Sequence, residues 1–299
     1  MTKSALETVL QRDGLVTAAA LGTLVLIAWA YVFWFAATMP VMQTTSLTEE
    51  PTIAIDTSGS MEMPNMDMSM DTPMTMPEGG AAAVATPTLA HWSTADFAII
   101  ATMWVAMMTG MMTPSAAPMI LLYARVGQGA AAKGKPFAST AWFAGGYVAA
   151  WTVFAALATG AQWALEQVAL LSPMTMSTTS RILGGVILLG AGVYQWTTLK
   201  DVCLSQCRAP LAFIQQHGGF RRDAAGSLQL GLRHGLYCIG CCWALMLLLF
   251  VGGVMNPLWI AGIAALVLLE KLLPAARWLP KLAGTVLALA GLWMVAKPY

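Results

Sequence analysis

Charge is the scarcest property of this chain. Asp, Glu, Lys and Arg together make up 10% of the 299 residues, whereas about 25% is typical of a soluble domain. Hydrophobic residues account for 58%, and the net charge is only +1. This composition excludes an ordinary soluble domain. Without a basic stripe interleaved with aromatic residues, it also gives no support for nucleic-acid binding.

Histidine and the common catalytic strings are scarce as well. The chain has three histidines, His91, His217 and His234, and a redox-active copper or iron centre usually uses several. The strings GxxxxGK[ST] and HExxH are both absent, so neither ATP-driven pumping nor this type of metalloprotease has support. An enzymatic role is therefore the less favoured interpretation.

Long apolar runs, by contrast, are abundant. A bilayer core about 30 Å thick needs roughly 20 apolar residues per helix. We predict an all-α fold, a polytopic transmembrane helix bundle of about seven spans. The predicted spans are residues 15–37, 94–123, 137–159, 181–199, 231–251, 257–273 and 282–296. The first run exceeds the roughly 7–15 apolar residues of a signal peptide, so we expect it to remain as an anchor helix.

Basic residues gather in alternate connecting segments. Because Lys and Arg mark the cytoplasmic loops of membrane proteins, the alternation predicts a cytoplasmic N-terminus and an external C-terminus. We expect a multi-pass protein of the bacterial inner membrane. The basic residues on the inner side would be Lys3, Arg12, Arg125, Lys133, Lys135, Lys200, Arg208, Arg221, Arg222, Lys271, Arg277 and Lys281.

The chain divides into three predicted parts: an anchor helix at 1–38, an extracytoplasmic segment at 39–93, and a six-helix membrane domain at 94–299. The middle part has no Lys or Arg and is rich in Pro, Thr and Ser, so we expect it to be disordered without a ligand. Within sixteen residues it carries Met61, Met63, Met66, Met68, Met70, Met74 and Met76. Thioethers are soft ligands that select Cu(I); a low-complexity linker is the alternative.

A second group of methionines lies in the span at 94–123. Met103, Met107 and Met111 are four residues apart and share one helix face, and Met108 and Met112 flank it. Such a stripe is more often core filling than a ligand set. Two further residues, Pro114 and Pro118, remove backbone donors, so the freed carbonyls need partners inside the protein.

The span at 231–251 opens with a third group, His234, Cys238, Cys241 and Cys242. At 3.6 residues per turn these side chains lie within an arc of about 100°. The face predicts a metal or redox site, and small-residue helix packing is the alternative. Counting 1.5 Å per residue from each span end, this group and the methionines come to similar depths near the bilayer centre.

Two further features lie at the predicted inner boundary. Cys203 and Cys207 are four residues apart, and as reduced cytoplasmic thiols they could form a two-coordinate entry or exit point for Cu(I); an absence of function is equally open. Glu270 stands inside an apolar run beside Lys271. Intramembrane carboxylates are functional candidates, but we favour a snorkelling pair at the boundary.

Several of these strings together resemble a known family. The strings are MMTGMMTPSAAPMILLYARV, GVYQWTTLKDVCLSQCRAP, GLRHGLYCIGCCWALM and GVMNPLWIAG followed by LLEKLLP. They are similar to a bacterial family of predicted metal-binding, multispanning integral membrane proteins of unknown function. The resemblance covers residues 94–293, and it implies metal binding without naming a reaction or a substrate.

The leading hypothesis is therefore a copper-handling membrane protein. Cu(I), or another soft metal, would be collected by the outer methionines and relayed or transported through the Met and Cys faces, with Cys203 and Cys207 as the terminal relay. The expected partners are the lipid bilayer, the metal ion, and a copper chaperone or metallo-oxidase. The alternatives are a membrane redox protein, an accessory or assembly subunit of a metallo-oxidase, and a scaffold subunit without metal.

Overall fold

The structure, a computed structural model, describes residues 5–48, 92–131, 133, 138–172, 176–273 and 277–296, with the side chains of the first range described at 15–38. All named elements in these ranges are helices, which confirms the all-α prediction. They are α1 (Ala5–Thr48), α2 (Thr94–Ala131), α3 (Thr140–Gln167), α4 (Arg181–Tyr194), α5 (Thr198–Arg208), α6 (Pro210–Gln216), α7 (Ala224–Leu247), α8 (Leu249–Gly252), α9 (Pro257–Leu272) and α10 (Trp278–Ala296).

Polar residues outside the apolar runs set where the helices begin. In six helices a side-chain oxygen accepts a hydrogen bond from a backbone N–H in the first turn, which satisfies a donor that has no partner within the helix. These capping residues are Ser93, Ser139, Ser180, Thr197, Asp223 and Asn256, at the starts of α2, α3, α4, α5, α7 and α9.

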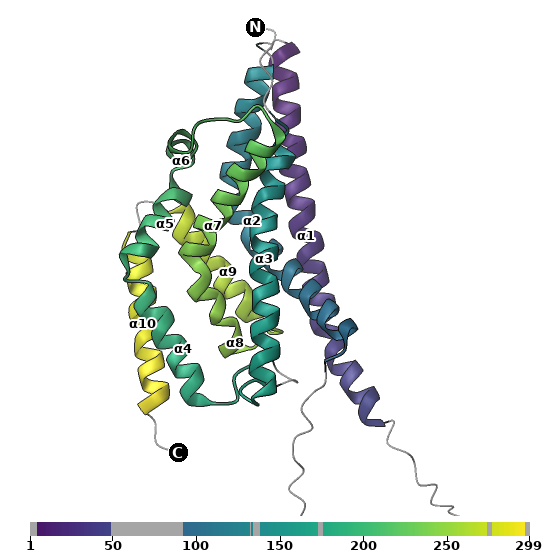
Figure 1. The fold of residues 1–299 in the computed structure, drawn as a ribbon, viewed down its shortest axis with the longest axis vertical. Coiled ribbons are helices and arrows are strands. Elements are labelled where there is room, and N and C mark those ends of the chain that lie inside the picture. Colours follow the sequence, from purple (N-terminus) through teal and green to yellow (C-terminus); the bar gives the residue numbers. More distant parts are fainter. Residues whose placement is uncertain are drawn as a thin grey trace, which may run out of the picture.

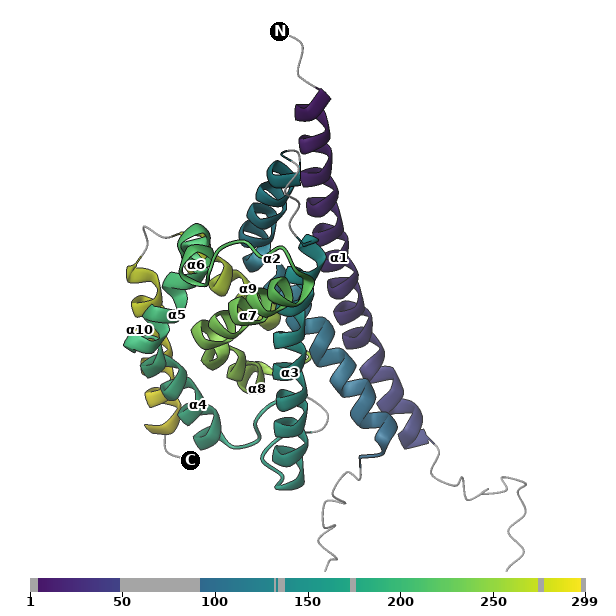
Figure 2. The ribbon, with the colours of Figure 1, turned by 45° about the horizontal axis from the view of Figure 1, so that its top comes forward.

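The helices form one bundle with two edges and a centre. Helix α1 lies along α2 at one edge, α4 and α10 pair at the opposite edge, and α7 and α9 run between them (Figure 1). The turned view shows the same order (Figure 2). The start of α1 and the end of α10 lie at opposite ends of the bundle (Figure 1). The centre of the bundle is therefore enclosed by helices on both sides.

The number of spans differs from the predicted seven. Among the described residues, five helical stretches are long and apolar enough to cross a membrane, and a sixth span results if α4 and α5, bent by 65° at their junction, count as one. Helix α9 has 16 residues, which is short of the roughly 20 that a bilayer core requires. It packs in the middle of the bundle, so its neighbours rather than its own length place it there.

The outer surface is apolar. Leu26 on α1, Leu157 on α3 and Leu289 on α10 are 72%, 69% and 62% exposed. Soluble monomers rarely expose large contiguous apolar areas, whereas a lipid-facing surface is expected to be apolar. Together with the long apolar helices, this surface identifies a polytopic membrane protein.

Glycines let two helix pairs approach closely. Between α4 and α10, a Cβ added at Gly192 would lie 2.7 Å from the carbonyl oxygen of Gly284. Between α3 and α7, a Cβ at Gly231 would collide with the carbonyl oxygen of Phe143. Small residues at such contacts are typical of membrane helix packing, because they let the backbones come together.

The α3–α7 contact yields a stability prediction. Gly231→Ala should lower the free energy of unfolding by about 1–3 kcal/mol or more, because the methyl group has to push two backbones apart. We expect a lower midpoint of thermal unfolding in detergent. Gly160→Ala makes the same change in α3, where nothing lies within 4 Å. It should be neutral or raise stability by up to about 1 kcal/mol, and equal effects at the two sites would contradict the close contact.

Candidate metal-binding site

Four thiols meet at the centre of the bundle. Cys238, Cys241 and Cys242 on α7 are each 1% exposed, and Cys207 is near the end of α5. The half-buried Cys207 thiol lies near those of Cys238 and Cys241, and the Cys238 thiol lies near that of Cys242. All four are free cysteines. We call Cys207, Cys238, Cys241 and Cys242 the thiol cluster.

The backbone of α7 holds two of these thiols in place. The Sγ atoms of Cys241 and Cys242 lie 3.0 and 2.9 Å from the carbonyl oxygen of Cys238, to which they donate. All three cysteines and His234 are buried, so they share the inward face of α7, as the spacing predicts. That face is turned toward α2, α3, α5 and α9, each of which supplies a neighbour.

A lysine contacts the cluster directly. The Nζ atom of Lys271, on α9, lies 2.8 Å from Cys238 Sγ and 3.0 Å from the hydroxyl oxygen of Ser115 on α2. The Tyr147 hydroxyl, on α3, lies 3.1 Å from the same sulfur and donates to the carbonyl oxygen of Met112 at 3.0 Å. The Cys238 sulfur is therefore contacted from α3 and α9, and the same two side chains link it to α2.

The predicted snorkelling pair is wrong. Glu270 and Lys271 are 1% and 6% exposed, and Glu270 forms an ion pair with Lys200 on α5, with Nζ and Oε2 2.7 Å apart. The Gln195 side chain, at the junction of α4 and α5, contacts both members of this pair, and Arg208 donates twice to the carbonyl oxygen of Glu270, at 2.8 and 2.6 Å. The ion pair thereby fastens α5 to α9.

The predicted methionine stripe is buried, and one member reaches the cluster. Met112 Sδ lies 3.9 Å from Cys242 Sγ. Helices α2 and α7 therefore touch at the two groups of residues that the sequence analysis placed at similar depths in the bilayer. The remaining stripe residues belong to the buried core: Met103, Met107, Met108 and Met111.

The remaining predicted ligands have other surroundings. His234 is 3% exposed, its ring packs among Phe143, Tyr147 and Phe213, and its Nδ1 atom has no hydrogen-bond partner. Cys203 lies against Gly240, where an added Cβ would be 2.7 Å from its sulfur. The predicted outer ligands Met61, Met63, Met66, Met68 and Met70 lie outside the described residues.

The thiols pack against one another rather than around a common centre. Among the described residues, no group of three or more His, Cys, Asp or Glu side chains is arranged to hold a metal ion. The sequence analysis also missed three residues around Cys238: Tyr147 and Lys271, which contact its sulfur, and Ser115, which contacts Lys271. Of these only Lys271 left a signal, a cation inside an apolar segment, which we assigned to the membrane boundary.

Fold and site together define a polytopic membrane protein with a buried cluster of soft ligands next to a cation. The chain belongs to the PpoB2 copper chaperone family, which it matches over residues 101–294. This match covers nearly the same residues as the resemblance to a metal-binding family, and it supports copper as the metal. No curated protein and no solved structure matches the chain.

The buried ion pair yields a prediction about the attachment of α5 to α9 beside the thiol cluster. Glu270→Gln leaves the Lys200 ammonium buried without a counter-charge, which costs about 3–5 kcal/mol. The midpoint of thermal unfolding in detergent should fall accordingly. Replacing both partners, Lys200→Met with Glu270→Leu, removes both charges and should recover most of this loss. A neutral Glu270→Gln would contradict the role of the ion pair in holding α5 to α9.

Proposed function

We propose that the protein binds Cu(I) in the thiol cluster and passes it on, as a copper chaperone within the membrane. The observation that carries this proposal is the proximity of four free thiols from two helices, beside Met112. Thiolate and thioether sulfur are the ligands that Cu(I) prefers. The family supports copper as the metal; the oxidation state and the ligands are our proposal.

Charge balance supports a role for Lys271. A Cu(I) ion held by two thiolates carries a net charge of −1, and an uncompensated charge is costly in a buried, low-dielectric site. The Lys271 ammonium, 2.8 Å from Cys238 Sγ, supplies the compensating positive charge. Simple packing of neutral thiols gives no reason to bury an ammonium there, so this contact favours metal binding over the scaffold alternative.

Copper entry requires a local rearrangement of the cluster. The Lys271 ammonium lies 2.8 Å from Cys238 Sγ, so it must shift from this sulfur while staying near when the ion enters between the thiols. Cys207 is the one member of the cluster on α5, so a rotation of its side chain can separate it from the other three thiols, which share α7. We propose Cys207 as the ligand that opens the cluster.

The wider route follows the predicted division of the chain. Residues 39–93 would collect Cu(I) through Met61, Met63, Met66, Met68 and Met70, the 1–38 helix would anchor the chain, and 94–299 would hold the cluster. We place the protein in the bacterial inner membrane with its N-terminus in the cytoplasm. The start of α1 and the end of α10 lie at opposite ends of the bundle (Figure 1), which agrees with an N-terminus and a C-terminus on different sides of the membrane. The recipient would be a soluble copper chaperone or a metallo-oxidase, for which this protein would act as an assembly factor.

Copper binding by the cluster can be tested directly. We expect the detergent-purified, reduced chain to bind Cu(I) in competition with a chromophoric Cu(I) chelator. The variant Cys238→Ser should bind at least tenfold more weakly, because losing one ligand bond that is worth more than about 1.4 kcal/mol changes affinity by that factor. Replacing Cys238, Cys241 and Cys242 together by Ala should abolish this binding.

Two controls separate the cluster from other copper ligands. Cys203→Ala removes a buried cysteine that lies against Gly240 and should leave the affinity unchanged. Deleting residues 61–76 should reduce the total copper bound but leave the cluster's share. If all copper is lost with this deletion and none with the triple replacement, the cluster is not the site. Elution of the triple variant as a monodisperse peak would show that it is still folded.

The charge argument predicts a further effect. Lys271→Met should weaken Cu(I) binding about tenfold or more, because a charge-assisted hydrogen bond contributes about 1.5–3 kcal/mol. The measurement is the same chelator competition. Lys133→Met, at an exposed position, is the matched control and should have no effect. Unchanged affinity in Lys271→Met would show that the ammonium does not compensate the charge of the copper complex.

A further inference from the structure

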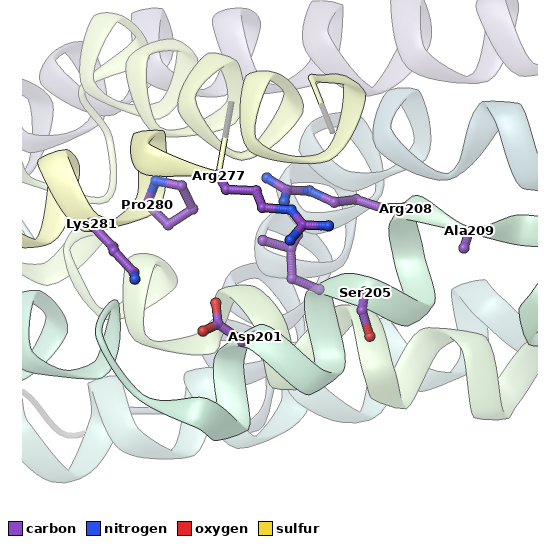
Figure 3. A pocket seen from close by; sticks show the side chains of 8 residues that line it. Asp201, Ser205, Arg208, Ala209, Arg277, Pro280 and Lys281 are labelled. Atoms are coloured by element: carbon purple, nitrogen blue, oxygen red, sulfur yellow. The ribbon is translucent and has the colours of Figure 1, made fainter. Parts of the chain in front are cut away.

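A basic pocket lies between α5 and the start of α10, apart from the thiol cluster. Its volume is about 590 Å³, and its charged lining consists of Arg208, Arg277, Lys281 and Asp201. The side chains of Arg208 and Arg277 extend toward one another, with Asp201 and Lys281 farther along the pocket (Figure 3). Three cations thus face one carboxylate, and like charges at close range repel.

Among the described residues, none forms an ion pair with the pocket's cations. Within the described part of the chain the ion pair is that of Lys200 and Glu270, so Asp201 forms none with Arg208, Arg277 or Lys281. Arg208 donates to the carbonyl oxygen of Glu270, which keeps its charge at the pocket wall. An anion in the pocket would relieve the repulsion between the cations.

An apolar groove begins one helical turn farther along α10. It has a volume of about 370 Å³ and runs between α4 and α10, with Trp196, Thr285, Ala288, Leu289 and Leu292 among its lining residues. The two features are adjacent, because the Lys281 ammonium of the pocket lies 5.9 Å from the centre of the Trp196 ring of the groove.

This arrangement has the two parts that a phospholipid needs. Basic pockets between transmembrane helices bind anionic lipid headgroups. The groove continues along the lipid-facing side of α10, where Leu289 and Leu292 are 62% and 57% exposed, so an acyl chain could lie in it. A small soluble anion would use the pocket but gain nothing from the groove.

We propose that this is a specific site for one anionic phospholipid. The headgroup phosphate lies between Arg208, Arg277 and Lys281, and one acyl chain lies in the groove between α4 and α10. The proposal is independent of copper, since it rests on residues outside the thiol cluster. It concerns the same helices, however, because the Glu270 carbonyl that Arg208 contacts belongs to the residue before Lys271.

The test compares lipids with the same acyl chains and different headgroups. Delipidated full-length protein in detergent is titrated with dioleoylphosphatidylglycerol, dioleoylphosphatidylcholine or glycerol 3-phosphate, and bound lipid is read by native mass spectrometry alongside the thermal midpoint. We expect the anionic lipid to be retained and to raise the midpoint, and the other two to have no such effect.

A double variant locates the site. Arg277→Gln with Lys281→Gln should weaken binding of the anionic lipid about thirtyfold, since each cation near a headgroup contributes about 1 kcal/mol and tenfold corresponds to 1.4 kcal/mol. Both side chains are exposed, so folding should be preserved. Lys133→Gln with Arg222→Gln removes two exposed charges elsewhere and should bind normally.

Three outcomes would overturn the proposal. Equal binding of phosphatidylcholine would show that the headgroup's negative charge does not determine binding. Equal stabilisation by glycerol 3-phosphate would assign the pocket to a free phosphate compound instead of a lipid. Undiminished phosphatidylglycerol binding by the Arg277 and Lys281 variant would place the lipid elsewhere on the protein.

Discussion

Near its end, helix α9 carries two adjacent residues of opposite charge, Glu270 and Lys271. Both are buried, and the partner that each one needs determines which helices meet at the centre of the protein. Neighbouring residues on a helix point about 100° apart, so Glu270 and Lys271 cannot share a partner on one side. Glu270 turns to Lys200 on α5, and Lys271 turns to Cys238 on α7. A charge inside a membrane protein needs such a partner, and these two contacts together fix α9 between α5 and α7.

The position of α5 depends on this constraint. The chain bends by 65° between α4 and α5, and Gln195 at the bend contacts both members of the ion pair. Arg208 adds a second attachment to Glu270. The preceding residue, Cys207, is thereby held against the thiols of α7. Glycines between α3 and α7 allow the close approach that brings the Tyr147 hydroxyl to Cys238.

A buried cluster of this kind suits the transfer of a soft metal ion. Cu(I) bound by sulfur in a dry interior is kept from water and from oxygen-donor ligands, and Lys271 would keep the complex neutral. The basic pocket shares Arg208 with the attachment of α5 to α9. Lipid at the basic pocket and copper at the bundle centre would therefore contact the same pair of helices.

The local parts of this picture could be predicted from the sequence, because they follow from the order of residues along one helix. Apolar runs gave the membrane helices, and the spacing from His234 to Cys242 gave the buried face of α7. The number of spans was harder to predict from the sequence. Helix α9 is short and is held in the bundle by its neighbours, and the bend between α4 and α5 interrupts an apolar run that looks continuous in the sequence.

Which residues from other helices surround the cysteines of α7 was decided by tertiary structure alone. Ser115 and Lys271 are 156 residues apart in the chain, and Tyr147 and Cys238 are 91 apart; no periodicity relates such positions. The sequence by itself determined a membrane bundle with soft ligands on particular faces. Which thiols meet, and that a lysine stands among them, depended on packing between helices, because buried charges in a bilayer are stabilised only by partners that the fold brings from elsewhere in the chain.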